Sequence, residues 1–186
     1  MMNAFAILLC SRGVPLFVMG DEFGRSQHGN NNAYCIDSDL TWVNWDLLQS
    51  NQSLQQFVAA LIDFRKRHPA LRVNNFLDSA CALGLPSASF HGPSPWRPDW
   101  SSESRQLAWM FCADQPDSHL GVDVVYVIAN MAHRASWFEC PALPDGLSWK
   151  LAFNTGDPSG AILSAEQPMD NQGLLVGERS VIILTT

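Results

Sequence analysis

The sequence lacks the features that mark nucleic-acid-binding and membrane proteins. Charged residues make up only 16% of the 186 residues, the formal net charge is −7, and no basic cluster occurs. Such a chain repels a phosphate backbone, so we expect no nucleic-acid partner. The apolar run at residues 4–10 is too short to span a bilayer and has no basic residues before it. We therefore expect neither a membrane partner nor a signal peptide.

Cysteine is also scarce. Five residues are an odd number, and they do not have the spacing of a zinc site. This pattern predicts free thiols in a reducing compartment and no metal site. The cysteines are Cys10, Cys35, Cys81, Cys112 and Cys140.

Hydrophobic residues, by contrast, are plentiful. They make up 47% of the chain and include seven tryptophans, which indicates a packed globular protein. The length fits one large domain, or one domain plus part of another. The pattern changes from helical to β near residue 73, which divides the chain into residues 1–72 and 73–186.

Two helices are predicted in the first part. Residues 4–10 form one, with Gly13 available for a left-handed cap. Ser53 caps the second, which ends at His68 because Pro69 disfavours helical geometry in the residue before it. Basic residues 65–67 in its last turn complement the helix dipole, which we favour over a role in substrate binding.

The second part predicts an antiparallel β-sandwich, because short strands alternate with turn residues. A long loop at residues 92–104 either has a function of its own or covers an exposed sheet edge. The candidate strands are 87–91, 106–112, 122–130, 136–140, 149–153, 174–176 and 180–184.

The most informative stretch is residues 13–37. Residues 14–19 are apolar, too short for an independent helix and without polar alternation, so they predict a strand buried on both faces, as in a parallel sheet. Polar side chains follow at once, as they do where ligands meet a barrel of parallel strands. No other candidate for such a strand precedes residue 75, so we expect the neighbouring strands to lie outside this chain.

This stretch resembles the isoamylase-type glycogen and starch debranching enzymes of the α-amylase superfamily, glycoside hydrolase family 13. The similarity rests on Gly-Val-Pro-Leu-Phe-Val-Met-Gly-Asp-Glu-Phe-Gly-Arg at 13–25 and on Gly-Asn-Asn-Asn-Ala-Tyr-Cys at 29–35. Shorter matches follow in the same order at residues 40–46, 61–71, 90–92 and 98–101.

The resemblance implies an α/β remnant followed by an all-β domain. Residues 1–72 would be the last strand and helix of a (β/α)8 barrel, and residues 73–186 a C-terminal antiparallel sandwich. The implied activity is hydrolysis of α-1,6 branch linkages in glycogen or a starch-like glucan, without a cofactor. The implied location is the bacterial cytoplasm or the plastid stroma.

No catalytic residue is assigned. A retaining glycosidase needs two carboxyl groups about 5–5.5 Å apart. Asp21 and Glu22 are adjacent and would point to opposite faces of a strand, so we expect one to be hydrogen-bonded beneath the site and the other to face the helical layer. The resemblance implies that the nucleophile, the acid/base and a third aspartate all lie upstream of Gly13. We therefore expect this chain alone to be inactive.

The loop after the predicted strand is our candidate wall of a glycan site. Amides match the adjacent hydroxyls of a sugar, and aromatic rings cover its apolar face. The alternative is that the asparagines form turns and satisfy their own backbone. The chosen substrate-binding residues are Asp21, Arg25, Gln27, His28, Asn30, Asn31, Asn32 and Tyr34.

Tryptophans near this loop present the same choice. For Trp42 and Trp45 we favour buried anchoring of the loop over stacking on glucose, and for His91 and residues 96–100 we favour domain packing. The chain departs from the family pattern at Ile36, where a polar residue is usual, and at Asn44, where aspartate is common.

Two other roles remain open. The β domain alone could bind glucan, with Trp96 and Trp100 as platforms. Alternatively, the chain could act as the regulatory partner of an active homologue, or pair with a separate barrel portion. If the chain is expressed alone, residues 1–72 should expose apolar surface, and they should then aggregate or need a partner to stay soluble.

Overall fold

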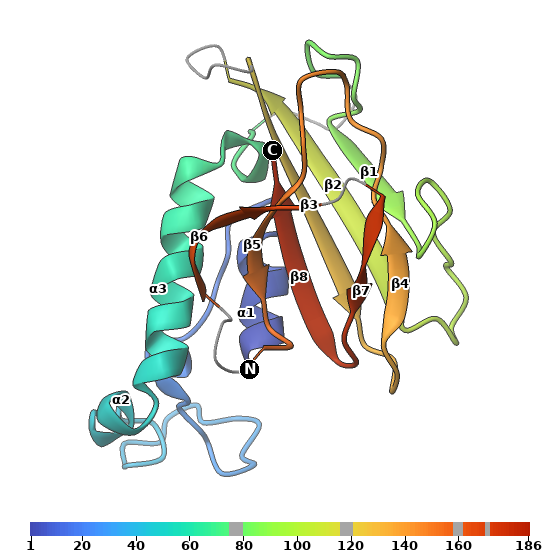
Figure 1. The fold of residues 1–186 in the computed structure, drawn as a ribbon. Coiled ribbons are helices and arrows are strands. Elements are labelled where there is room, and N and C mark those ends of the chain that lie inside the picture. The colour runs from blue at the N-terminus through green and yellow to red at the C-terminus, as the bar shows by residue number, and fades with distance from the viewer. Residues whose placement is uncertain (75–79, 116–120, 158–161, 170–171) are drawn as a thin grey trace.

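The computed structural model describes residues 1–74, 80–115, 121–157, 162–169 and 172–186. Within these ranges every strand pair is antiparallel. Six strands form one sheet in the order β1-β2-β3-β8-β5-β6, and β4 pairs with β7 in a second, smaller sheet (Figure 1). The strands are β1 Ala88–His91, β2 Gln106–Asp114, β3 Val122–Asn130, β4 Ser136–Glu139, β5 Lys150–Asn154, β6 Ile162–Pro168, β7 Gly173–Val176 and β8 Ser180–Thr185.

Seven of these strands confirm the sequence prediction to within a few residues. The eighth, β6 Ile162–Pro168, was missed, because Ile-Leu-Ser-Ala-Glu-Gln-Pro has no β-branched run. It lies at the edge of the large sheet beside β5, where one neighbour supplies all the pairing. The best-predicted strand is β3, in which every residue is buried.

Alternating residues of β2 and β3 face two separate apolar cores. On one face, Trp109, Phe111 and Val127 pack against the helices. On the other face, Met110 and Tyr126 pack beneath β4 and β7. This alternation is the two-residue period of a strand. The result is three layers, with helices on one side of the large sheet and the small sheet on the other (Figure 1).

The helical layer contains α1 Met2–Leu9, α2 Asp46–Ser50 and α3 Gln52–Arg67, with 3-10 turns η1 Asp21–Phe23 and η2 Pro69–Leu71. The prediction that Ser53 caps α3 is wrong: the cap position is Asn51, two residues earlier, and the helix begins at Gln52. The Asn51 side chain makes no cap and instead donates to the Phe23 carbonyl at 2.9 Å. The predicted end is confirmed, with His68 extended before Pro69.

The predicted role of Arg65 is also corrected. Its side chain is buried and turns away from the end of α3 towards α1. The guanidinium donates to the carbonyls of Leu9 and Ser11 at 2.7 Å and of Gly13 at 2.5 Å. Arg65 therefore satisfies the carbonyl end of α1, a role predicted for Gly13. Gly13 itself has φ 97° but lies beyond Cys10, the residue that caps the helix.

Residues 14–19 do not form the predicted buried strand. Val14 is 95% exposed and Leu16 is 86% exposed, whereas Phe17 is half-buried against Phe5, with ring centroids 5.5 Å apart. The burial alternates as in an extended chain. No strand of the described ranges lies beside this segment, so its backbone has no ladder to join.

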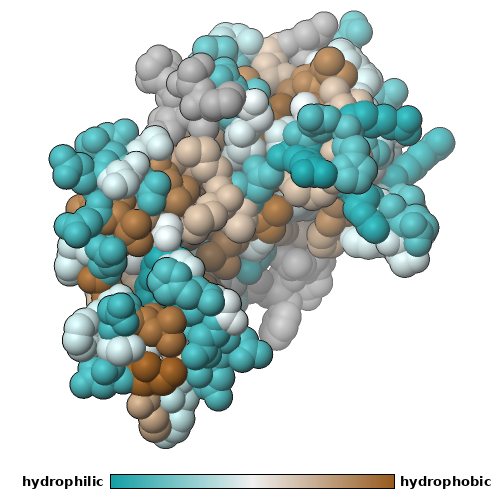
Figure 2. Space-filling view, turned by 90° about the horizontal axis from the view of Figure 1, so that it is seen from below, coloured by the Kyte–Doolittle hydropathy of each residue, from teal (hydrophilic) through white to brown (hydrophobic). Residues whose placement is uncertain are grey.

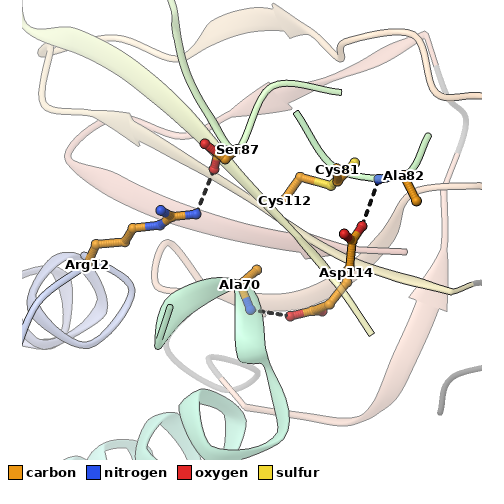
Figure 3. Close-up of a disulfide and its surroundings, with 8 residues drawn as sticks. Arg12, Ala70, Cys81, Ala82, Ser87, Cys112 and Asp114 are labelled. Atoms are coloured by element: carbon orange, nitrogen blue, oxygen red, sulfur yellow. Dashed lines mark hydrogen bonds between the residues drawn. A yellow bond between two sulfur atoms is a disulfide. The ribbon is translucent and has the colours of Figure 1, made fainter. Parts of the chain in front are cut away.

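The prediction of free thiols is wrong for two cysteines. Cys81 and Cys112 form a disulfide with a Cα–Cα distance of 6.2 Å (Figure 3). It ties the turn between Ala80 and Pro86 to β2, and Asp114 reinforces it by accepting the Ala82 N–H at 2.7 Å. The two partners are 31 residues apart, so no local pattern signalled the pairing. Of the other cysteines, Cys10 and Cys140 are buried and Cys35 is exposed.

The core beneath the helices contains side chains from both predicted domains. Phe57 and Phe64 of α3 contact Phe153 of β5 edge to face, at 5.9 and 5.3 Å between ring centroids. The division at residue 72 stays a prediction. Whatever its outcome, the helical layer and the sheet bury a common apolar surface.

Candidate functional site

The candidate site begins at a turn bounded by two glycines. Gly20 and Gly24 flank η1 with φ of 98° and 87°, a left-handed geometry that favours glycine. A β-carbon on Gly20 would lie 3.2 Å from the Arg25 side chain. The two glycines let the chain reverse tightly, and Arg25 packs across the turn.

Both adjacent carboxylates of this turn bind local backbone. Asp21 Oδ2 accepts the Val18 N–H at 3.0 Å, and Glu22 Oε2 accepts the Gly20 N–H at 2.9 Å. The expectation that only one carboxylate is hydrogen-bonded was therefore too narrow, because the pair lies in a 3-10 turn and not on a strand. Each carboxylate stabilises the turn that precedes Arg25.

A cavity of about 410 Å³ lies beside this turn. Arg25 and His28, two of the predicted residues, line it, and Arg25 Nη2 lies 3.4 Å from the Thr41 carbonyl oxygen. Trp42 forms another part of the wall and donates its indole N–H to Asp37 at 2.9 Å. The full lining is Gly24, Arg25, Ser26, His28, Asp39, Trp42, Val43, Asn44 and Leu47.

Buried anchoring by Trp42 and Trp45 is a wrong prediction. Their side chains are 60% and 62% exposed. Trp45 contacts only the edge of the core, with its ring 5.8 Å from that of Phe23. The loop lies at the end of the helical layer, so no other element of the described ranges covers the outer faces of these rings. Trp42 is therefore available to a ligand in the cavity.

The three asparagines do not share one role: two bind the backbone of the loop, and the third is free of such bonds among those described. Asn30 Oδ1 accepts the Asn32 N–H at 2.8 Å, and Asn32 Oδ1 accepts the Tyr34 N–H at 3.2 Å. These two carbonyls satisfy the backbone of their own turns, which is the alternative that we left open. Asn31 and Tyr34 are exposed and do not line the cavity.

Asp21 also lies away from the Arg25 cavity. It lines a second, apolar hollow of about 450 Å³ with Phe5, Leu16 and Val18. The eight predicted residues therefore do not converge on one place. Gln27 is half-buried and its carbonyl accepts the Asn30 N–H at 2.9 Å.

The sequence interpretation missed Asp39, Ser26, Val43 and Leu47 as cavity residues. Asp39 had a usable signal, since it immediately precedes residues 40–46, which match the debranching enzymes. The remaining three are small or apolar residues that only the path of the loop brings to the cavity.

The described part of the chain shows neither a metal-binding cluster nor a membrane-spanning helix. No three His, Cys, Asp or Glu side chains lie close enough there to hold a metal ion. None of the helices in the same ranges is both long and apolar enough to cross a membrane.

In Figure 2, apolar residues form patches bordered by hydrophilic ones on the face seen from below.

Solved structures with a similar fold include pullulanases. The pullulanase of Bacillus acidopullulyticus superposes with a TM-score of 0.68 at 16% identity, over 100% of this chain and 20% of that one. The type I pullulanase of Bacillus subtilis, complexed with maltose, gives 0.69 at 20% identity, over 99% and 22%. The fold is thus that of a part of these debranching glycoside hydrolases.

Sequence comparison defines the relationship more narrowly. Isoamylase 1 of rice is 35% identical over 162 residues, and isoamylase SU1 of maize is 34% identical over 157. The glycogen debranching enzyme of an Enterobacter strain is 54% identical over 69 residues. These alignments cover 86%, 84% and 37% of this chain. No protein-family profile matches it.

This chain is a relative of the C-terminal part of isoamylase-type glycogen and starch debranching enzymes, as the resemblance of residues 13–46 implied. It spans about 18% of the length of the rice and maize isoamylases and 10% of the Enterobacter enzyme.

Proposed function

We propose that this chain works as the C-terminal portion of an isoamylase-type α-1,6-glucosidase. Residues outside these 186 would supply the catalytic carboxylates. The chain would contribute the cavity loop to the substrate cleft and the β domain to the stability of the enzyme. The observation that carries the proposal is the open cavity of about 410 Å³ beside Arg25, His28 and Trp42, in a chain similar to the debranching enzymes.

The cavity has the chemistry that a neutral glucan needs. An indole ring covers the apolar face of a pyranose, while guanidinium, imidazole, amide and carboxylate groups bind its hydroxyls. The net charge of −7 does not oppose an uncharged ligand. Related pullulanases have been solved in complex with maltotetraose and with maltohexaose. We propose a branched α-glucan as the ligand here.

The remaining predicted residues fit the outer wall of this cleft. Asn31 and Tyr34 are exposed on the loop between the cavity residues His28 and Asp39. Asn30 and Asn32 hold that loop in shape, and Asp21 and Gln27 support its base. In this proposal Arg25, His28, Asn31 and Tyr34 are the four of the eight predicted residues that contact sugar, together with Trp42 of the cavity wall.

We also propose that residues 14–19 complete a parallel barrel. Their alternating burial is already that of an extended chain, with Phe17 facing α1. Val14, Leu16 and Val18 carry apolar surface on the other side, which a neighbouring strand or side-chain layer would cover. This is the finer form of the predicted fold, in which residues 1–72 end a (β/α)8 barrel.

A chimera tests the proposal directly. This chain would replace the matching part of rice isoamylase 1, and the release of reducing ends from amylopectin would be measured. We expect debranching by the chimera and none by the 186-residue chain alone. A folded chimera that binds amylopectin but releases no chains would contradict the proposal.

Two variants of the chimera address the cavity. Arg25→Ala and His28→Ala should each lower kcat/KM about tenfold, because each removes a hydrogen-bonding group from the cleft. The matched control is Lys66→Ala, since that side chain is exposed on α3 and pairs only with Asp63. Equal activity in all three variants would exclude a role for the cavity.

A regulatory role is the second candidate, and one observation favours it. The exposed apolar side chains of residues 14–19 border the hollow of about 450 Å³ at α1. Such a surface could hold a separate, active homologue. Activation of rice isoamylase 1 by the added chain, with a complex in size-exclusion chromatography, would support this role. The named relatives are chloroplastic or bacterial, so we propose the plastid stroma or the bacterial cytoplasm as the location.

A further inference from the structure

The loop between β1 and β2 has a specific, internally braced conformation. At its start, a β-carbon on Gly92 would clash with the Arg97 carbonyl oxygen, so only glycine fits. Trp96 has φ 65°, a left-handed geometry that is unusual for a bulky residue. The Pro93 carbonyl accepts the Glu139 N–H of β4 at 2.9 Å. Conformations of this kind persist only where the surroundings impose them, and they occur often at ligand sites.

A buried histidine fixes the middle of this loop. His91 Nδ1 lies 2.9 Å from the Trp96 backbone nitrogen, which can only donate. In the neutral ring, Nε2 then carries the proton and donates to Ser89 Oγ at 2.8 Å. Burial lowers the pKa of His91 to about 4, so the ring is neutral at pH 7. Both ring nitrogens are thus used to position Trp96 and the loop.

The braced loop presents two indole rings to solvent. Trp96 is 51% exposed and contacts the His91 ring at 4.7 Å, while Trp100 is 67% exposed and contacts Phe90 at 5.5 Å. The packing expected for His91 and residues 96–100 is therefore found for His91, which is buried against Tyr126, but not for these two indole rings. Each ring rests against a neighbour on β1 and keeps much of its surface open.

Trp100 also forms a wall of a hollow of about 350 Å³. The floor is apolar, with Leu107, Ala129 and Met131. The rim carries a carboxylate, an amide, a guanidinium and hydroxyls from Asp99, Gln106, Arg105, Ser101 and Ser104. This volume falls within the range of about 300–1,000 Å³ that is usual for ligand pockets.

The rim is ordered by its own hydrogen bonds. Asp99 accepts the Ser101 N–H at 2.9 Å, and this bond lowers the pKa of the carboxyl group. The side-chain amide of Gln106 donates to Asn130 Oδ1 at 3.2 Å. This bond fixes the orientation of the amide and therefore of its side-chain carbonyl oxygen. Arg105 Nη1 donates to the carbonyls of Ser102 and Ser104 at 2.9 and 3.0 Å. A ligand would meet polar groups already held in place, which lowers the entropy cost of binding.

We propose that this hollow is a second glucan-binding site, separate from the cavity at Arg25. Trp100 stacks on the apolar face of a glucosyl unit, and Asp99, Arg105 and Gln106 bind its hydroxyls. The choice of an α-linked glucan rests on the proposed function, whereas the site itself rests on the loop. A chain of several glucosyl units held here would be retained on the enzyme between cleavage events.

The test uses maltoheptaose and isothermal titration calorimetry on the 186-residue chain. We expect Trp100→Ala to weaken binding at this site about tenfold. Trp137→Ala is the matched control, because Trp137 is 53% exposed on β4 and lines neither cavity. It should stay within twofold of the wild type. Near-ultraviolet circular dichroism checks that each variant is folded.

A third variant, Trp42→Ala, separates this inference from the proposed function. Loss with Trp100→Ala but not with Trp42→Ala supports the second site and counts against the Arg25 cavity. Loss with Trp42→Ala alone overturns the second site and leaves the proposed function intact. Absence of maltoheptaose binding by the wild type overturns the second site. Binding that appears only after Trp100 is removed would assign this surface to packing instead, and would overturn it too.

Discussion

The large sheet and the cavity loop of residues 20–45 use similar residues in opposite ways. Tryptophan in the sheet domain is fully buried at Trp149, whose indole donates to the Pro141 carbonyl at 3.0 Å. Tryptophan in the loop is more than half exposed at Trp42 and Trp45. Strand β3 satisfies its backbone with two neighbours, whereas the loop satisfies its backbone with its own side chains.

This difference assigns stability mainly to the sheet and ligand binding mainly to the loop. Side chains inside the sheet have little freedom, so a change there costs folding free energy. Side chains of the loop are held by short-range bonds and leave their rings and charges open. We expect substitutions in the sheet to alter stability and substitutions in the loop to alter binding. The same division places Trp100 with the loop, although it follows a strand of the sheet.

Thiol reactivity should show the largest contrast between the buried core and the cavity loop. Burial raises the pKa of Cys10 to about 12, an effect that Arg65 partly offsets. At pH 7 its thiolate fraction is then about a thousandfold below that of an ordinary thiol. We expect exposed Cys35 to react with a thiol reagent at least about a thousandfold faster than Cys10. Cys35→Ser should remove the fast phase, and a fast phase that persists would show that the core opens readily.

Removal of a core indole should have the largest effect on stability. Trp149→Ala should lower the free energy of unfolding by about 4 kcal/mol, because it leaves a cavity beneath the small sheet and frees the Pro141 carbonyl. Urea denaturation followed by circular dichroism measures this. The exposed Trp137→Ala should cost less than about 0.5 kcal/mol. Similar losses of unfolding free energy in the two variants would contradict the difference between buried and exposed tryptophans.

Arg65 joins α3 to the end of α1, and its loss should have an intermediate effect on stability. Arg65→Met keeps the apolar stem but leaves three carbonyls, those of Leu9, Ser11 and Gly13, without their donor. We expect a loss of about 2–3 kcal/mol. Hydrogen exchange should also rise at residues 10–13. Lys66→Met, on the exposed side of α3, should change neither quantity; if it does, the effect is one of charge and not of the buried contact.

The last contrast is a pH dependence from His91. Its pKa is about 4 when folded and about 6.5 in an unfolded chain, so the unfolded state binds more protons between these values. Stability should therefore fall as the pH drops from about 6.5 to 4. His91→Gln should flatten this part of the urea-midpoint profile. An unchanged slope in His91→Gln would show that another group carries the pH dependence.

The part of the fold that could be predicted is the part with local signals. The apolar runs of β2, β3 and β8 and the helical period of α3 identify those elements without knowledge of their neighbours. Pro69 marks the end of α3 in the same way. The edge strand β6 was missed because its residues are weakly β-forming and one partner strand stabilises it.

The site was predicted less completely, for a physical reason. Arg25 and His28 were chosen for their residue type and do line one cavity, but Asp21 lies at a different hollow. Exposure of Trp42 and Trp100 depends on what packs over them, which no local pattern describes. Residues 14–19 show the same limit, because a strand exists only when a partner strand accepts its hydrogen bonds.

The sequence alone determined helices α1 and α3, seven of the eight described strands and the debranching-type segments at residues 13–46. These follow from residue type, spacing and short-range geometry. Only the tertiary structure decided that Arg65 caps α1, that Cys81 meets Cys112, and that Trp42 and Trp100 stay open to solvent. Such features depend on contacts between residues far apart in the chain, and the energy of those contacts is set by packing.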